Sequence, residues 1–207
     1  MYKQAYDLAA LNSKLIPKND YNEFMLDLVL RHTALDFQLF CKVQAFRLSY
    51  PDVYVHSINV ARSAIDVGYL LMADTYILAF ASVLHDIGKI GIPREIINKP
   101  SKLTDEEYEI MKTHTTEGAR LIEQSLKIES DFCKKMIYEV VLYHHEKWNG
   151  KGYPTGKKED EIPLGARIMA VADVFDAVSK NRCYREAMSL DESFEIIRKG
   201  IGTDFDP

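Results

Sequence analysis

One short stretch decides how this chain folds, Leu84-His85-Asp86-Ile87-Gly88-Lys89. It follows an apolar run, residues 76–84, that predicts the end of a buried helix. Adjacent helical residues diverge by about 100°, so the imidazole of His85 and the carboxylate of Asp86 can reach two different cations. A carboxylate can also bridge cations about 3.5–4 Å apart. If the last helical turn continues, Lys89 emerges on the same face, beside any anion that such cations hold.

The length and the cysteine content favour one cytoplasmic domain. A chain of 207 residues can bury roughly 70% of its unfolded surface, with room for a small appendage. The cysteines, Cys41, Cys133 and Cys183, show no paired spacing, which argues for a reducing compartment. The N-terminus has no apolar signal core, and the most apolar run, residues 69–84, is too short to span a bilayer. We therefore expect a cytoplasmic protein without a membrane partner.

The charge balance argues against nucleic acid as a partner. The formal net charge is −5, and a negative chain is repelled by a phosphate backbone. A phosphate ligand would have to be held by local positive groups or by metal ions.

Helix signals recur along the chain. Capping boxes start at Asp20, Thr104 and Ser189, each with a glutamate three residues later. Pro51 and Pro163 suit the first turns of two further helices. Apolar residues between these signals recur at spacings of three and four, and no segment of any length alternates as a strand would. The sequence therefore predicts an all-α fold.

The N-terminal part gives no indication of function. A short helix is expected to end before Pro17, and a second is expected to run from Asp20 through Leu39. We interpret residues 1–45 as a helical extension of unknown role, and residues 46–207 as the functional domain.

Histidines and aspartates fall at the ends or on the apolar faces of successive helices. Asp173 and Asp176 interrupt a helix that is otherwise apolar almost all round, so at least one should face a metal or a buried base. Each histidine alone has a structural explanation, such as a helix-dipole partner for His114. Together they can build a multinuclear metal site in the core of a helical bundle. The candidate ligands are His56, His85, Asp86, His114, His144, His145 and Asp173.

Asp52 is a further candidate for a third cation. It stands four residues before His56, so both side chains lie on one helix face and form a workable metal edge. An acidic residue in a first helical turn also complements the helix dipole, and both interpretations remain open.

Four longer motifs occur in sequence. They are HDIGKIGIP at residues 85–93, KTH at 112–114, HHEKWNGKGYP at 144–154 and ARIMAVADVFDA at 166–177. In this order they resemble the HD-GYP family, a branch of the HD metal-dependent phosphohydrolases. The resemblance covers roughly residues 50–207.

The resemblance implies an HD-domain helical bundle with two or three divalent metal ions. Iron or manganese is expected, with zinc, nickel and magnesium left open. The implied reaction is hydrolysis of cyclic di-GMP to linear pGpG, to GMP, or to both, in bacterial second-messenger signalling. The chain would then be an enzyme, a cyclic di-GMP phosphodiesterase. Family domains continue past the last residues present here, so the chain is expected to lack a final helix.

The same resemblance assigns roles to individual residues. All the candidate ligands above match the family's metal ligands, with Asp86 bridging, and Asp52 stands where trinuclear members have glutamate. Asp86 and Lys89 would be catalytic. Lys89 would also contact substrate phosphate, together with Arg182 and Arg185.

The loop Gly152-Tyr153-Pro154 is associated in the family with a lid over the substrate. It is also associated with contacts to diguanylate cyclase (GGDEF) domains, which are therefore expected partners, and a homodimer is expected as well. Its glycines free the backbone of Cβ clashes, so it can pass close to a ligand.

Two alternatives remain open at this stage. The metal core would also suit an HD phosphohydrolase for another nucleotide, such as cyclic GMP-AMP, a nucleoside triphosphate or an alarmone. A protein of a different class, a non-catalytic cyclic-dinucleotide receptor, would bind the dinucleotide and signal through the same loop.

Overall fold

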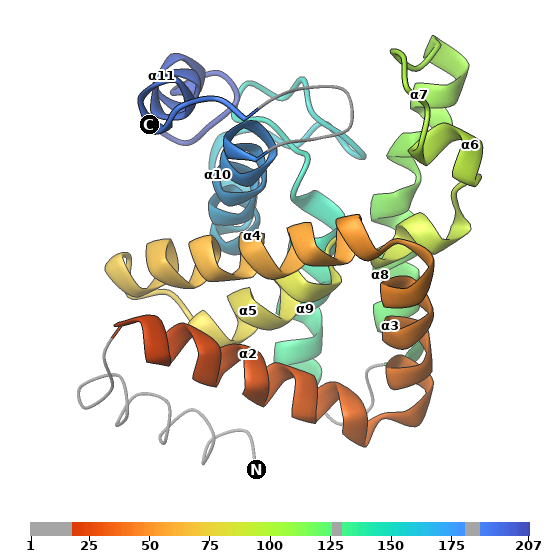
Figure 1. Ribbon diagram of the computed structural model, residues 1–207. Coiled ribbons are helices and arrows are strands. Elements are labelled where there is room, and N and C mark those ends of the chain that lie inside the picture. The colour runs from red at the N-terminus through yellow and green to blue at the C-terminus, as the bar shows by residue number, and fades with distance from the viewer. Residues whose placement is uncertain (1–17, 126–129, 181–186) are drawn as a thin grey trace.

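This computed structural model describes residues 18–125, 130–180 and 187–207. The regular structure within these residues is helical (Figure 1). Within these residues there is no β-strand, and one isolated bridge joins Ile201 and Phe205. The all-α prediction is therefore confirmed. The helices are α2 (Lys18–Leu35), α3 (Phe37–Ser49), α4 (Pro51–Leu70), α5 (Thr75–Leu84), α6 (Arg94–Ile97), α7 (Asp105–Lys112), α8 (His114–Ser125), α9 (Asp131–Tyr143), α10 (Leu164–Ser179) and α11 (Leu190–Gly200), with short 3-10 segments η1 (Ile87–Gly91) and η2 (Glu159–Glu161).

α5 is the central helix of the bundle. All ten of its residues are buried, and it packs against α4, α9 and α2. It is apolar all round, which is the pattern of a helix enclosed by other helices. The side chain of Asp74 caps its N-terminus by accepting a hydrogen bond from the main-chain N–H of Ile77 at 3.1 Å. Its C-terminus therefore delivers His85 and Asp86 to the interior.

α4 runs across the molecule, with α10 on one side and α2 on the other (Figure 1). Pro51 occupies its first turn as predicted, and the helix is 20 residues long. α10 packs against α4 and α9. These contacts bring α4 and α10 together although 93 residues lie between them in the sequence.

The segment after α5 turns tightly against the start of α8. A Cβ placed on Gly88 would lie 2.0 Å from the carbonyl oxygen of His114 and 2.5 Å from the main-chain nitrogen of Gly118. Real Cβ atoms do not approach main-chain atoms this closely. Glycine at position 88 therefore lets η1 pack against α8, which holds Asp86 near His114.

Several predicted helix ends are confirmed. Thr104 and Ser189 each form the capping box expected from the sequence, for α7 and α11. Three boundaries differ. α2 begins at Lys18, so Asp20 lies inside it, and a break at Asp36 separates α2 from α3. The carboxylate of Asp36 accepts from the main-chain N–H of Leu39 at 3.0 Å and so starts the new helix.

The third boundary concerns α8, which begins at His114 and not near Glu117 as expected. Only Thr113 separates α7 from α8, so His114 sits at a junction of two helices.

The N-terminal helices belong to the same packed core as the rest. Tyr21, Met25 and Val29 of α2 are buried in the main apolar cluster, and the hydroxyl groups of Tyr21 and Thr75 are 2.8 Å apart. The helix predicted before Pro17 lies outside the described residues. The proposed boundary near residue 45 stays a prediction.

Cys41 is exposed and Cys133 is buried, and both are free thiols. No helix in the described part of the chain combines the length and the apolar character that crossing a bilayer requires.

Candidate metal centre

Three histidines are oriented in the same way at helix ends. His85 follows α5, His114 follows the end of α7, and His144 follows α9. The Nδ1 atom of each ring donates to the main-chain carbonyl three residues earlier, at 2.7, 2.7 and 2.8 Å respectively. Carbonyl groups in the last turn of a helix lack an intrahelical partner and are free to accept. Because Nδ1 carries the proton in each ring, the Nε2 atoms present lone pairs to the interior.

Two of these lone pairs face one another. Nε2 of His114 lies 3.4 Å from Nε2 of His144. Burial lowers the pKa of His114 to about 3 and lowers the pKa of His144 well below its ordinary value. Both rings are therefore neutral near pH 7, and no proton is present between the two nitrogens. Such an arrangement is repulsive alone and becomes favourable when a cation accepts both lone pairs.

Asp86 occupies the space between the histidines. Its carboxylate oxygens lie 3.4 Å from Nε2 of His85 and 3.5 Å from Nε2 of His114, and Oδ2 accepts from Lys89 Nζ at 2.6 Å. Burial opposes its ionisation, but Lys89 and the nearby histidines outweigh this and hold the pKa of Asp86 well below its ordinary value. Its other oxygen, Oδ1, is buried and has no hydrogen-bond partner. A buried, charged and unpaired oxygen is costly unless a cation binds it.

A second group joins α4 to α10. Nε2 of His56 lies 2.9 Å from Oδ1 of Asp173, and Nδ1 lies 2.6 Å from Oδ2 of Asp176. Burial opposes protonation of His56, but the hydrogen bonds to both aspartates outweigh it and raise the pKa of His56 to about 9. Burial also opposes ionisation of Asp173, and the neighbouring histidines overcome it and lower the pKa of Asp173 below its ordinary value.

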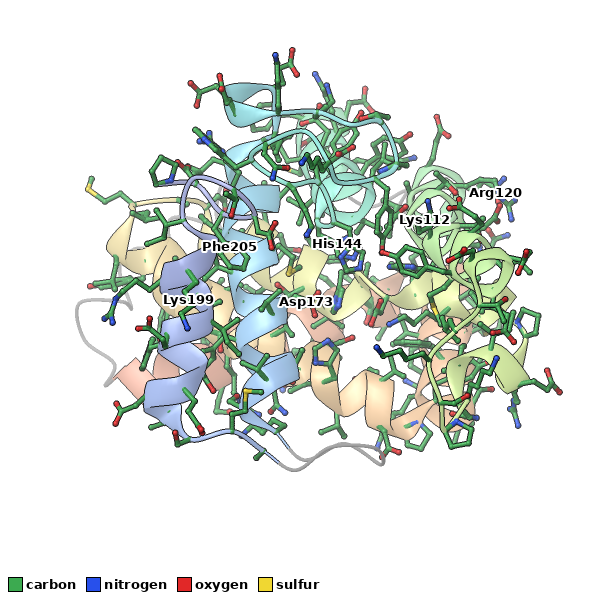
Figure 2. The ribbon with its side chains drawn as sticks, turned by 90° about the horizontal axis from the view of Figure 1, so that it is seen from above. Lys112, Arg120, His144, Asp173, Lys199 and Phe205 are labelled. Carbon is green, nitrogen blue, oxygen red and sulfur yellow. The ribbon has the colours of Figure 1, made fainter. Side chains whose placement is uncertain are left out.

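The ligand atoms converge into three overlapping groups, in each of which they lie within 4.8 Å of one another. Overlap between the groups places more than one candidate site in a single cluster. Figure 2 shows His144 and Asp173 near the middle of the view, with Lys199 and Arg120 at its outer sides. The groups are His114 with His144 and His145, His56 with His85 and Asp173, and His85 with Asp86 and His144.

The chemistry of the cluster fits divalent metal ions. Neutral imidazoles and carboxylates are the donors that iron, manganese and zinc share, and the unpaired Oδ1 of Asp86 with the facing nitrogens of His114 and His144 leaves donor atoms without a protein partner. His145 adds another neutral donor, since burial lowers its pKa to about 4. The candidate ligands named from the sequence are thus brought together, Asp52 excepted.

The glycine-rich loop after α9 covers one side of the cluster. The ring centroids of Tyr153 and His145 are 4.8 Å apart, with an angle of 33° between the ring planes. The main-chain N–H of Tyr153 donates to the carbonyl of His145 at 3.2 Å. A Cβ on Gly152 would lie 2.4 Å from Cα of Glu146 and from the nitrogen of Lys147. Glycine at position 152 therefore allows the loop to fold back onto the histidines.

Glu146 fixes this loop from beneath. It is 2% exposed, and its Oε1 accepts from the N–H of Thr155 at 2.7 Å, from the hydroxyl of Thr155 at 2.8 Å and from the N–H of Gly156 at 3.1 Å. Three hydrogen bonds to one carboxylate oxygen make a strong local anchor, because the acceptor is charged. The loop therefore has a defined position over the cluster.

The outer rim of the site carries a cation and two aromatic rings. Lys112 Nζ lies 5.5 Å from the ring centroid of Tyr108 and 5.8 Å from that of Tyr153. The two tyrosine rings meet edge to face, with centroids 6.3 Å apart. In the view of Figure 2, Lys112 lies between His144 and Arg120.

Three sequence-predicted residues are not joined to the cluster by the described contacts. Asp52 is exposed in the first turn of α4 and belongs to none of the three groups. Its assignment to a third metal stays a prediction. Arg182 and Arg185 lie outside the described residues, and their assignment to substrate also stays a prediction.

Two residues in the site were not assigned a role from the sequence. Asp176 was noted only as one of two carboxylates in an apolar helix, and its bond to His56 joins residues 120 positions apart. Glu146 belongs to the motif at residues 144–154, but nothing in the sequence indicates that its carboxylate is buried beneath the loop.

The fold and the cluster together define a class of protein. A sequence model of the HD domain family matches residues 32–207. The chain therefore belongs to the HD domain family, and the resemblance found in the sequence is confirmed.

Curated relatives are similar over much of this chain. A probable cyclic di-GMP phosphodiesterase of Vibrio cholerae is 44% identical over 173 residues, which cover 82% of this chain and 36% of the relative. A cyclic di-GMP phosphodiesterase of Thermotoga maritima is 47% identical over 130 residues, which cover 63% of this chain and 34% of the relative. A 3′3′-cGAMP-specific phosphodiesterase 2 of V. cholerae is 39% identical over 127 residues, covering 61% of this chain and 24% of the relative. The chain thus spans about a third or less of the relatives' lengths.

Solved structures confirm the fold. An HDG"Y"P protein from Bdellovibrio bacteriovorus superposes with a TM-score of 0.61 at 17% identity, covering 97% of this chain and 73% of that chain. The HD domain of the phosphodiesterase PgpH from L. monocytogenes, in complex with cyclic-di-AMP, gives 0.59 at 19% identity and covers 76% and 79%.

Proposed function

We propose that this chain is a metal-dependent phosphodiesterase that hydrolyses cyclic di-GMP to pGpG, to GMP, or to both, in bacterial second-messenger signalling. The proposal rests above all on Asp86, a buried carboxylate with one oxygen on Lys89 and the other unpaired among neutral imidazoles. A bridging carboxylate places one oxygen on each of two cations, and Oδ1 of Asp86 is an oxygen that has no other partner. Relatives named cyclic di-GMP phosphodiesterases support the choice of substrate.

We further propose which residues hold the cations. Asp86 would be the bridging ligand, and the set would be completed by His56, His85, His114, His144, His145 and Asp173. When bound, two divalent cations would supply Lewis-acid activation of water and of the phosphodiester. The donor set of imidazole and carboxylate supports iron or manganese as the resident metal.

The chain's own side chains would bind and orient the substrate. The ammonium of Lys89 is partly exposed while it holds Asp86, so it can also face a phosphodiester oxygen and offset the charge that spreads over it. Tyr153 covers His145, and burial raises the pKa of Tyr153 above its ordinary value, so its hydroxyl stays neutral and can donate a hydrogen bond. Arg182 and Arg185 would add positive charge to the substrate site.

A second substrate is favoured by one specific observation. The 3′3′-cGAMP-specific phosphodiesterase of V. cholerae described above is 39% identical to this chain. Cyclic GMP-AMP carries the same kind of phosphodiester as cyclic di-GMP, so the same metal centre would serve both, and the nucleobases would have to be distinguished elsewhere in the site.

One experiment tests the function. The protein is purified under anaerobic conditions, its metal content is measured, and the same sample is incubated separately with cyclic di-GMP and cyclic GMP-AMP. We expect about two equivalents of iron or manganese and conversion of cyclic di-GMP to pGpG or GMP, resolved by chromatography. Full metal occupancy without turnover of either dinucleotide would overturn the enzymatic proposal in favour of a receptor.

Partners other than the dinucleotide are also proposals. The packing of Gly152-Tyr153-Pro154 over the cluster supports a lid role for the loop. Contact of this loop with GGDEF domains, and a homodimer, stay predictions from the sequence.

A further inference from the structure

The imidazole of His56 is held differently from the three helix-end histidines of the cluster. His85, His114 and His144 use carbonyl groups at helix ends as acceptors for Nδ1. His56 lies inside α4, which spans Pro51–Leu70. The carbonyls that precede it belong to the helical hydrogen-bond ladder. The ring therefore needs an acceptor from another element.

Asp176 of α10 supplies that acceptor. Its Oδ2 lies 2.6 Å from Nδ1 of His56, and the side chain is 7% exposed. Asp176 itself belongs to none of the three ligand groups. It stands three residues after Asp173, so both carboxylates project from one face of α10 toward His56.

The two aspartates engage opposite sides of the same ring. Asp176 contacts Nδ1, and Asp173 contacts Nε2 at 2.9 Å. Asp173 and His56 belong to one candidate ligand group, together with His85. A carboxylate that accepts a hydrogen bond from Nδ1–H leaves Nε2 as the nitrogen that can bind a cation, and it fixes the plane of the ring.

We propose that Asp176 is a positioning residue that holds His56 in the Nδ1-protonated form, with Nε2 directed at the cation shared by His85 and Asp173. This inference rests on the proposed metal centre. It extends that proposal, because only the metal site that contains His56 would depend on Asp176. The end formed by His114, His144 and His145 has no contact with Asp176 among the described residues.

Metal retention by variants of the full chain tests the proposal. Asp176→Ala removes the acceptor, whereas Asp176→Asn keeps an acceptor oxygen of the same size. Asp191→Asn, at an exposed position in α11, is the matched control for the change of charge. Each protein is loaded with zinc, and the zinc retained is titrated with a competing chelator.

We expect Asp176→Ala to weaken one of the bound zinc ions about 10- to 100-fold and to leave the other as in the wild type. Asp176→Asn should restore the affinity to within about threefold, and Asp191→Asn should behave as the wild type. Wild-type retention of both ions by Asp176→Ala would overturn the proposal. Equal loss of both ions, or failure of Asp176→Asn to exceed Asp176→Ala, would also overturn it.

A measurement on the wild-type protein keeps the test independent of variant folding. In the zinc-loaded chain with ¹⁵N-labelled histidine, the ring nitrogens of His56 report which atom carries the proton. Nδ1 protonated and Nε2 bound to zinc is the expected result, and the reverse arrangement contradicts the proposal. Neither readout requires turnover, so a failed substrate assignment would leave this result intact, whereas a wild-type chain that binds no zinc would count against the metal centre itself.

Discussion

At the scale of single residues, Asp86 and Lys89 have separable roles. Asp86 offers oxygens to the cluster, whereas Lys89 contacts only Asp86 among the contacts described for its ammonium. Under the proposed function, loss of the Asp86 carboxylate would remove the metal site, whereas loss of the Lys89 ammonium would remove only charge stabilisation of the substrate.

We predict that Asp86→Asn abolishes metal loading and hydrolysis together. The amide cannot bridge two cations, because only one of its two terminal atoms is an oxygen with lone pairs. Elemental analysis and cyclic di-GMP turnover on one sample provide the measurement. Retained metal with a wild-type rate would refute the assignment of Asp86.

We predict that Lys89→Met keeps the metal content and slows turnover by roughly 10²- to 10³-fold, the usual cost of losing one group that stabilises developing charge. Lys151→Met, on the exposed part of the loop, is the control and should retain the wild-type rate. A variant at position 89 that loses its metal would show that the lysine supports the ligands and not the substrate.

Gly88 sets the distance between η1 and α8. Gly88→Ala should lower the free energy of unfolding by about 1–3 kcal/mol, because the new methyl group meets main-chain atoms that cannot move aside. Gly91→Ala is the matched control, since nothing lies within 4 Å of a Cβ at that position. Urea denaturation of both variants measures the difference, and equal stabilities would contradict the close approach.

At the scale of elements, the loop after α9 depends on Glu146. Glu146→Ala leaves two main-chain N–H groups and one hydroxyl without their acceptor, at a cost of about 1–3 kcal/mol. Hydrogen exchange at the amides of Thr155 and Gly156 should accelerate. Glu146→Gln keeps an acceptor oxygen and should exchange at nearly the wild-type rate, so similar acceleration in both variants would contradict this role.

Helix ends were predictable from sequence where the signal is local. Thr104 and Ser189 start their helices as expected, since a capping box lies within four residues of sequence. The break at Asp36 was missed because the apolar spacing continues across it. The start of α8 was misplaced because α7 and α8 are separated only by Thr113.

The candidate site was only partly predictable, for a related reason. The clustering of histidines could be inferred because several of them follow the ends of buried helices, which converge in a bundle. The bond between His56 and Asp176 could not, since it depends on how α4 rotates against α10. The hydrogen bonds of Glu146 likewise depend on a loop path that propensities do not determine.

At the scale of the whole molecule, metal binding should stabilise the fold. A ligand at about 100 times its dissociation constant adds about 2.7 kcal/mol, and the cluster joins α4, α5, α8, α9 and α10. Removal of metal with a chelator should therefore lower the melting temperature. Differential scanning calorimetry measures this shift, and Asp86→Asn should show none.

The loop that covers the cluster is tied to a distant part of the chain. The main-chain N–H groups of Trp148 and Asn149 donate to the carbonyls of Asp204 and Thr203, at 3.2 and 2.9 Å. Lys147 also pairs with Asp204 at 3.0 Å. The turn after α11 thus supports the loop that covers the cluster. A displacement of α11 would therefore be transmitted to the loop that carries Tyr153 through the hydrogen bonds of Trp148 and Asn149. The histidines themselves would not have to move.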